Sequence, residues 1–131
     1  LAPDAWVEGA IEAEATPFAL NRNGNVGASF GLMIKYLDAN RWCAMRWGSY
    51  GGVSLLIRDG EGRTVKLGQL QPVPGETRRV KVLLRGGYLA VVLDGIVQSI
   101  LQDPFAAQAG RPGLFTETEC SFDNVRIERV R

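Results

Sequence analysis

The sequence predicts an all-β domain, a two-sheet antiparallel β-sandwich of about ten short strands. Apolar and polar residues alternate with a period of two along most of the chain. Glycine-rich turns interrupt this alternation at the spacing typical of sandwiches and barrels, and no segment carries a sustained helical period. A chain of 131 residues suits one hydrophobic core, so we expect residues 1–131 to form a single domain.

The first strand is expected over residues 6–15. Three glutamates, Glu8, Glu12 and Glu14, fall on one face of this segment, and small or apolar residues fall on the other. A helix is the alternative, since Ala and Glu are good helix formers. The alternation favours a strand whose acidic face is solvated.

Nine more strands complete the predicted sandwich. They are expected over residues 28–37, 41–47, 53–58, 64–70, 77–85, 88–93, 96–101, 113–116 and 121–130. Turns rich in Asp, Asn and Gly separate them, and Asp94-Gly95 is a typical hairpin turn. The loop that precedes the last two strands is expected to hold one helical turn at 105–108.

The hairpin of residues 28–37 and 41–47 carries large apolar residues on both faces. This pattern indicates a central position in a sheet. We expect one face of the hairpin to lie in the core and the other to line a groove or to be covered by a loop.

Composition restricts the classes of partner. Fifteen basic residues oppose fourteen acidic ones, for a formal net charge of +1. Nucleic-acid binding relies on a basic field, so no nucleic-acid partner is expected. No apolar run is long enough to cross a bilayer, which argues against membrane insertion. The first six residues do not resemble a signal peptide, so any export signal is expected outside this chain.

Two cysteines, Cys43 and Cys120, lie far apart and fit no metal-ligand spacing. A disulfide between them would close a long loop and stabilise the fold by a few kcal/mol. The alternative is two buried free thiols, because free cysteine packs as a small hydrophobic residue. The sequence leaves both open.

Three segments carry a family resemblance. Gly31–Trp47 is an apolar strand that turns over Asp and Asn and returns through aromatic residues. Tyr88–Gly95 ends in Asp-Gly before another apolar strand, and Gly110–Phe115 is followed by Phe122–Ile127 as a closing pair. In this order, from about Trp6 to Val130, they resemble the concanavalin A-like lectin and laminin-G family of jelly-roll sandwiches.

The resemblance implies a class of function. Members of this family are commonly carbohydrate-binding modules, adhesion domains or accessory domains of secreted bacterial enzymes, and a minority are glycoside hydrolases. It also implies an extracellular or periplasmic setting, where disulfides are permitted.

Catalytic chemistry is not expected. A retaining glycosidase needs two carboxyl groups about 5–5.5 Å apart. The hydrolase branch of the family carries a Glu-x-Asp-x-x-Glu strand in its cleft, whereas the glutamates of the first strand lack the Asp. The strands expected in the groove carry Lys35, Arg41 and Arg46 instead of acids. The chain contains no histidine, which removes most general-base and triad arrangements.

A binding surface is the better interpretation. Trp42 and Trp47 are five residues apart, so they point to opposite faces of one strand, one into the core and one into the groove. We expect Trp47 and Tyr50, at a strand end, to bind a ligand, with Arg46 and Arg58 as hydrogen-bond donors. The alternative is that Trp47 and Tyr50 cover the edge of the core.

A structural calcium ion is a second candidate ligand, and no other cofactor is expected. Some members of the family hold an ion with an Asp in the closing strand, which matches Asp123. Calcium needs six to eight oxygen ligands, and the sequence offers one or two. The alternative is that Asp123 hydrogen-bonds to nearby backbone or to Asn124.

These observations together predict a non-catalytic carbohydrate-binding or accessory module of a larger secreted or cell-surface protein, with a polysaccharide or glycan as its partner. The alternative is a protein-interaction or assembly module whose exposed aromatic residues form an interface with other protein domains. A small glycoside hydrolase is a third alternative, which the absence of paired carboxylates in the groove disfavours.

Overall fold

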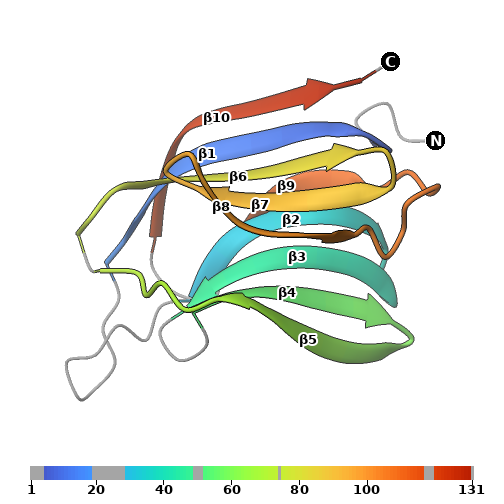
Figure 1. The fold of residues 1–131 in the computed structure, drawn as a ribbon, viewed down its shortest axis with the longest axis horizontal. Helices are drawn as coiled ribbons and strands as arrows, with labels where there is room; N and C mark the ends of the chain where they lie inside the picture. Colours follow the sequence, from blue (N-terminus) through green and yellow to red (C-terminus); the bar gives the residue numbers. More distant parts are fainter. Residues whose placement is uncertain (1–4, 19–28, 49–51, 74, 117–119, 131) are drawn as a thin grey trace.

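The computed structural model describes residues 5–18, 29–48, 52–73, 75–116 and 120–130. It confirms an all-β sandwich and contains the strands β1 (Gly9–Pro17), β2 (Ser29–Asp38), β3 (Arg41–Gly48), β4 (Gly52–Asp59), β5 (Glu61–Gly68), β6 (Arg78–Arg85), β7 (Tyr88–Leu93), β8 (Ile96–Gln102), β9 (Arg111–Thr116) and β10 (Cys120–Arg129) (Figure 1). No helix capable of spanning a membrane occurs among these residues.

The strands form two antiparallel sheets of five strands each. The first sheet has the order β10-β1-β6-β7-β8, and the second sheet has the order β5-β4-β3-β2-β9. Figure 1 shows β10, β1, β6 and β7 side by side in its upper part and β2 to β5 side by side in its lower part. The first and last strands of the chain are therefore neighbours in one sheet.

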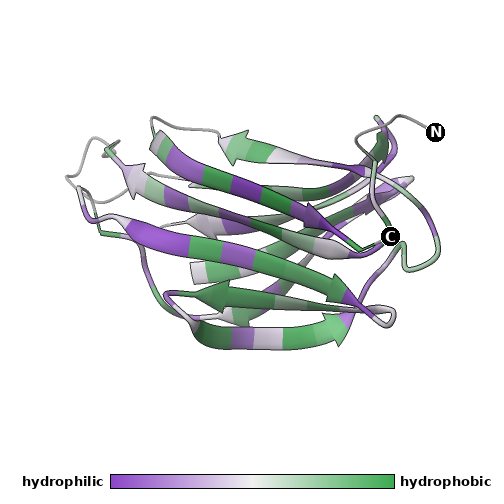
Figure 2. Cartoon of the chain, turned by 90° about the horizontal axis from the view of Figure 1, so that it is seen from above, coloured by the Kyte–Doolittle hydropathy of each residue, from purple (hydrophilic) through white to green (hydrophobic). Residues whose placement is uncertain are grey.

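The hydrophobic core lies between the two sheets. Fully buried residues that are cross-strand neighbours within each sheet line its centre: Ile11, Val82 and Val91 on the first sheet, and Leu32, Met45 and Leu55 on the second. Polar and apolar bands alternate along the strands (Figure 2), as expected when one face of each strand is buried. Burial of each large side chain contributes roughly 1.5–3 kcal/mol.

Strand limits depart from expectation by a few residues, and β1, for example, begins at Gly9 rather than at residue 6. β4 and β5 meet at a single residue, Gly60, whose φ of 76° favours glycine, so β5 starts earlier than predicted. β9 begins at Arg111 and includes Pro112, which an edge strand tolerates because its N–H need not join a ladder. The predicted helical turn at 105–108 is a hydrogen-bonded turn, closed by the N–H of Gln108 on the carbonyl of Phe105 at 2.9 Å.

An irregularity in β2 reverses the faces of two residues. Met33 pairs with Ala44, Lys35 with Cys43 and Tyr36 with Trp42, so the register shifts between Met33 and Lys35. Such a bulge moves the following side chains to the other face of the sheet. Lys35 is thereby fully buried, and its predicted place in a groove is wrong.

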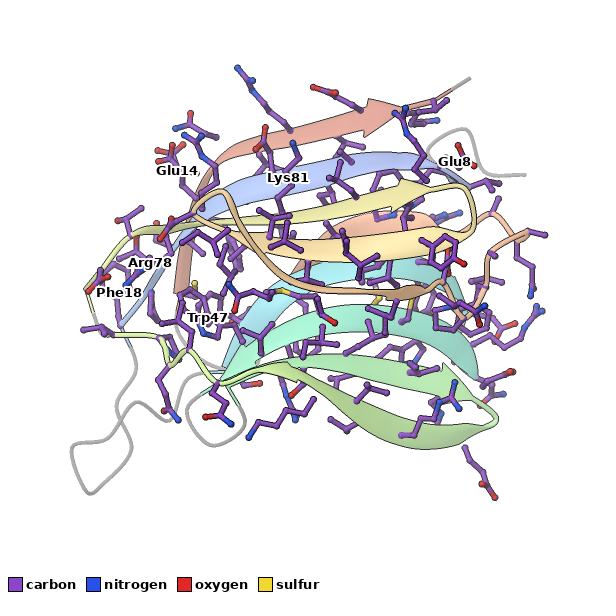
Figure 3. All side chains as sticks on the ribbon, in the orientation of Figure 1. Glu8, Glu14, Phe18, Trp47, Arg78 and Lys81 are labelled. Carbon is purple, nitrogen blue, oxygen red and sulfur yellow. The ribbon has the colours of Figure 1, made fainter. Side chains whose placement is uncertain are left out.

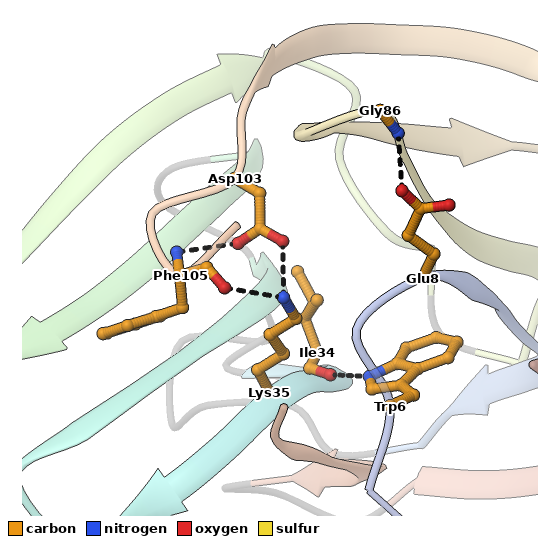
Figure 4. Close-up of polar contacts among 7 residues, drawn as sticks. All are labelled: Trp6, Glu8, Ile34, Lys35, Gly86, Asp103 and Phe105. Atoms are coloured by element: carbon orange, nitrogen blue, oxygen red, sulfur yellow. Dashed lines mark hydrogen bonds and ion pairs between the residues drawn. The ribbon is translucent and has the colours of Figure 1, made fainter. Parts of the chain in front are cut away.

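The ammonium of Lys35 is held by the loop that follows β8 (Figure 4). Its Nζ lies 2.8 Å from Oδ2 of Asp103 and donates to the carbonyl of Phe105, also at 2.8 Å. Oδ1 of Asp103 accepts the N–H of Phe105. The ion pair is almost completely shielded from water, and these hydrogen bonds compensate its desolvation.

Three further contacts hold the segment that precedes β1 beside this loop, and Figure 4 shows two of them. The indole N–H of Trp6 donates to the carbonyl of Ile34 at 2.6 Å, and the backbones of Trp6 and Gly110 exchange two hydrogen bonds. Glu8 accepts the N–H of Gly86 through Oε1. The loop after β8 is thus tied to both sheets.

Both cysteines are free thiols. Cys43 lies in the core on the second sheet, where burial and the nearby Asp103 carboxylate raise its pKa to about 12. Cys120 is half-buried on β10 of the first sheet, and burial raises its pKa as well. The disulfide is not formed, and the free-thiol alternative describes this structure.

Candidate functional site

Trp47 belongs to the core. Its side chain is completely buried (Figure 3), its indole N–H donates to the carbonyl of Leu70 at 2.7 Å, and its ring lies 5.6 Å from that of Phe30. A ring with no exposed surface cannot stack on a ligand, so the predicted binding role of Trp47 is wrong in this structure. Tyr50, predicted beside it, lies outside the described residues.

Trp42 occupies the position that was expected of Trp47. It lies on the opposite side of β3 and is half-buried. Tyr36 of β2 and Arg58 of β4 are its direct cross-strand partners. Tyr36 is 42% exposed, and Arg58 is also exposed. These three side chains form a row of two aromatic rings and a guanidinium across neighbouring strands.

Arg46 lies on the same face, four residues along β3, or roughly 13 Å from Trp42. Its cross-strand partners are Gly31 and Ser54, and Lys66 of β5 lies opposite Ser54. Arg46 and Arg58 therefore share a face, and it is the face opposite to that of Trp47. Gly31 is required here, because a Cβ would lie 1.9 Å from the carbonyl oxygen of Met45.

Cross-strand pairing identifies three neighbouring rows of outward positions on the second sheet. We call this set the outer face: Gly31, Met33 and Tyr36 on β2; Trp42, Ala44 and Arg46 on β3; Ser54, Leu56 and Arg58 on β4; Gly62, Thr64 and Lys66 on β5; Arg111, Gly113 and Phe115 on β9. Its middle row is apolar except for Thr64 at the edge, and polar or aromatic rows flank it. Such a surface offers flat rings bordered by a few hydrogen-bonding groups.

Comparison with solved structures identifies the architecture. The carbohydrate-binding module CBM66 from Bacillus subtilis is similar with a TM-score of 0.73 at 16% identity, over 96% of this chain and 78% of that one. Galectin LEC-6 from Caenorhabditis elegans is similar with a TM-score of 0.66 at 8% identity, over 92% of this chain and 81% of that one. The chain has the concanavalin A-like jelly-roll fold.

A β-glucanase from Bacillus licheniformis shares this jelly roll with a TM-score of 0.65 at 12% identity, over 98% of this chain and 69% of that one. No protein-family model matches the sequence, and no curated protein matches it. These structural similarities establish the jelly-roll fold alone, because the sequence identities are low. The ligand has to be argued from the side chains.

One end of the outer face continues into a hollow of about 550 Å³. Tyr36, Arg111, Arg41 and Gln108 contribute to its lining. Arg41 is held in place by Asp38, at 2.9 Å, and by Oε1 of Gln108, at 3.2 Å. The aromatic row thus opens onto a recess with fixed polar groups.

A second hollow, of about 700 Å³, lies on the outward side of the first sheet of the jelly roll. Glu12 and Glu14 line it together with cations and aliphatic side chains. Glu14 accepts from the amide of Asn124 at 3.0 Å and lies 3.9 Å from Arg79. Charges of both signs alternate here, so the acidic residues form a neutralised solvated face, as expected.

Asp123 makes a local hydrogen bond. Its Oδ1 accepts the N–H of Asn124 at 2.8 Å, at the irregularity where β10 pairs with β1. No group of three or more His, Cys, Asp or Glu side chains that could hold a metal ion occurs in the described part of the chain. Calcium binding at Asp123 stays a prediction, with a single ligand identified.

Sequence reasoning missed Tyr36 and the role of Trp42. Five-residue spacing correctly placed the two tryptophans on opposite faces, and the hairpin register pairs Trp42 with Arg58. The signal for Trp42 was therefore present. Regular alternation would put Tyr36 on the core side of β2, and only the irregularity after Met33 turns it outward.

Proposed function

We propose that this domain binds carbohydrate through the outer face of the second sheet. The observation that carries the proposal is the Tyr36–Trp42–Arg58 row, in which two exposed or half-buried rings adjoin a guanidinium. Aromatic rings pack against the apolar faces of sugars, and neighbouring polar groups hydrogen-bond their substituents. The similarity to a carbohydrate-binding module and a galectin supports it.

The proposed role is binding without hydrolysis. Glycoside hydrolysis generally requires a pair of carboxyl groups at the sugar. The described outer face carries arginine, lysine and hydroxyl side chains at its polar positions and no Asp or Glu. We propose that the domain is an accessory module of a larger secreted or cell-surface protein, in an extracellular or periplasmic setting.

Replacement of Trp42 by Ala tests the proposal. We expect the affinity for a bound polysaccharide to fall about tenfold or more, roughly 1.4 kcal/mol, because the central ring is lost. Affinity gel electrophoresis or calorimetry with the polysaccharide measures the change. Tyr88→Ala is the matched control, because Tyr88 is a 53% exposed aromatic residue on the first sheet.

Tryptophan fluorescence gives an independent readout. Trp6 and Trp47 are buried, so a glycan-induced shift should arise from Trp42 and disappear in Trp42→Phe. Binding that survives Trp42→Ala and is lost in Tyr88→Ala would move the site to the first sheet. A broad panel of glycans without any binding would contradict the proposed function.

Association with a second copy is the second candidate function, and β8 favours it. This edge strand carries no charged residue, and Ile96 and Ile100 are about two-thirds exposed. The other edge strands β5, β9 and β10 carry the charges or proline that usually prevent edge pairing. Sedimentation of the wild-type domain measures this association directly.

A further inference from the structure

We infer that the ligand of the outer face is an anionic glycan, one whose sugars carry carboxylate or sulfate groups. This inference rests on the proposed function and specifies its substrate class. It follows from the distribution of charge, from the lack of described protein partners for Arg46, Arg58 and Lys66, and from the hydrogen-bonding character of the face.

Cations are concentrated on this face although the chain as a whole is almost neutral, with a formal charge of +1. Arg46, Arg58, Lys66 and Arg111 occupy its outward positions, and the described outward positions of the second sheet include no acid. On the first sheet, by contrast, acids and bases face each other across the strands. The field over the outer face is therefore positive and attracts anions.

Three of these cations have no protein partner in the described structure. Elsewhere, Arg41, Arg78 and Lys35 each form an ion pair with an aspartate. No hydrogen bond or ion pair joins the side chain of Arg46, Arg58 or Lys66 to another described residue. Their charges remain available to a ligand.

The hydrogen-bonding character of the face also favours an anion. Guanidinium, ammonium and indole groups donate hydrogen bonds and cannot accept them. Among the side chains of the outer face, those of Tyr36 and Thr64 are exposed and carry hydroxyl acceptors, whereas the hydroxyl of Ser54 is buried. Hydroxyls of a neutral sugar both donate and accept, so many would lack an acceptor here. Carboxylates and sulfates only accept, and they form short charge-assisted bonds with arginine.

The cations flank the rings at both ends of the face. Arg58 adjoins Trp42, whereas Arg46 and Lys66 lie roughly 13 Å further along the strands. An apolar middle row separates them. This arrangement suits a chain of sugars that carries anionic groups at intervals and presents apolar ring faces between them.

Matched pairs of polysaccharides test the inference on the intact domain. Polygalacturonate is compared with its fully methyl-esterified form, and dextran sulfate with dextran, so that the sugar backbone is the same within each pair and the charge differs. We expect at least tenfold tighter binding of one anionic member, and affinity that falls as the salt concentration rises. The two pairs distinguish carboxylate from sulfate recognition.

Variants assign the effect to the face. Arg46→Gln and Arg58→Gln should each weaken anionic binding at least fivefold. Lys81→Gln, the same charge change on the first sheet, should leave it within a factor of two. Polyaspartate should not compete, because it lacks sugar rings for Trp42.

The outcomes separate this inference from the proposed function. Equal binding of charged and neutral members, unchanged in the two arginine variants, would overturn the anionic specificity and leave carbohydrate binding intact. No binding of any member would overturn both. Competition by polyaspartate, or equal losses in Lys81→Gln and the arginine variants, would reduce the effect to general electrostatic attraction and overturn the inference.

Discussion

Two tryptophans on one strand have opposite roles. Trp42 and Trp47 each follow an arginine in the sequence, so their spacing predicts a division between core and surface without showing which of the two is buried. Partners from distant segments decide it. Phe30 and the carbonyl of Leu70 enclose the indole of Trp47, whereas Trp42 is paired with a surface arginine.

Replacement of Trp47 by Ala should lower the free energy of unfolding by about 3–5 kcal/mol, because it opens a cavity and removes a buried hydrogen bond. Urea denaturation measures the loss. Trp42→Ala is the comparison and should cost much less, since Trp42 is half-buried. A larger loss for Trp42→Ala than for Trp47→Ala would contradict these assignments.

The irregularity in β2 is the element that shapes the site. It turns Lys35 into the interior and Tyr36 outward within two residues. Period-two alternation assumes a regular ladder, so a sequence pattern assigns both residues to the wrong face. The carboxylate that stabilises Lys35 lies in a loop 68 residues further along the chain, and local patterns contain no signal for it.

Replacement of Lys35 by Met should cost about 3–5 kcal/mol of stability, because it leaves the carboxylate of Asp103 buried without its cation. Thermal or urea denaturation measures it. The double variant Lys35→Met, Asp103→Asn should regain part of the loss, since Asn removes the charge and still accepts the N–H of Phe105. A double variant that is no more stable than Lys35→Met would argue against an uncompensated charge.

The turn between β2 and β3 should make stability depend on acid pH. The N–H of Asn40 and the guanidinium of Arg41 lower the pKa of the Asp38 carboxyl. Because the folded pKa lies below the ordinary value of about 3.9, the ionised group stabilises the fold above that pH. This contribution is lost as the pH falls through the folded pKa.

Melting temperatures of wild type and Asp38→Asn should therefore differ at pH 7 and converge as the pH falls and the carboxyl of Asp38 becomes protonated. Asn retains an oxygen for the N–H of Asn40, so the difference reports the charge. A gap that widens as the pH falls would reverse the expected sign and contradict the role of the carboxylate.

At the scale of the whole molecule, the local sequence pattern predicts one part of the fold, and the pairing of distant strands determines the rest. Alternation and turn residues predicted the strands and their approximate limits, because both act between near neighbours. The order of strands within each sheet depends on contacts between distant segments. β9, for example, pairs with β2, and β10 pairs with β1.

The same difference between local patterns and distant pairing explains which residues of the site could be predicted from the sequence. Arg46 and Arg58 were predicted as hydrogen-bond donors beside Trp47, and the register of β3 with β4 places both on the outer face instead. The contribution of Arg111 requires the pairing of β9 with β2, which no local pattern contains. Most polar residues of the outer face thus come from the consecutive strands β2 to β5, and Arg111 joins them from a distant segment.

Association through β8 is a property of the whole molecule and has its own prediction. Ile100→Lys should abolish a wild-type dimer seen by sedimentation at micromolar concentration, because it places a charge on an uncharged edge strand. Val125→Lys, a comparable change at a 45% exposed residue of β10, should not. A dimer that survives Ile100→Lys and dissociates with Val125→Lys would place the interface on the opposite edge of the first sheet.

The pairing of β1 with β10 has a consequence for protein architecture. The N–H of Val130 donates to the carbonyl of Glu8 at 3.1 Å, so the two ends of the described fold leave from neighbouring strands (Figure 1). A domain of this kind can be inserted into a surface loop of a host protein without forcing the two sides of that loop apart. Both junctions would lie on the first sheet. The cationic outer face belongs to the other sheet, so it would point away from the host and stay accessible to a ligand.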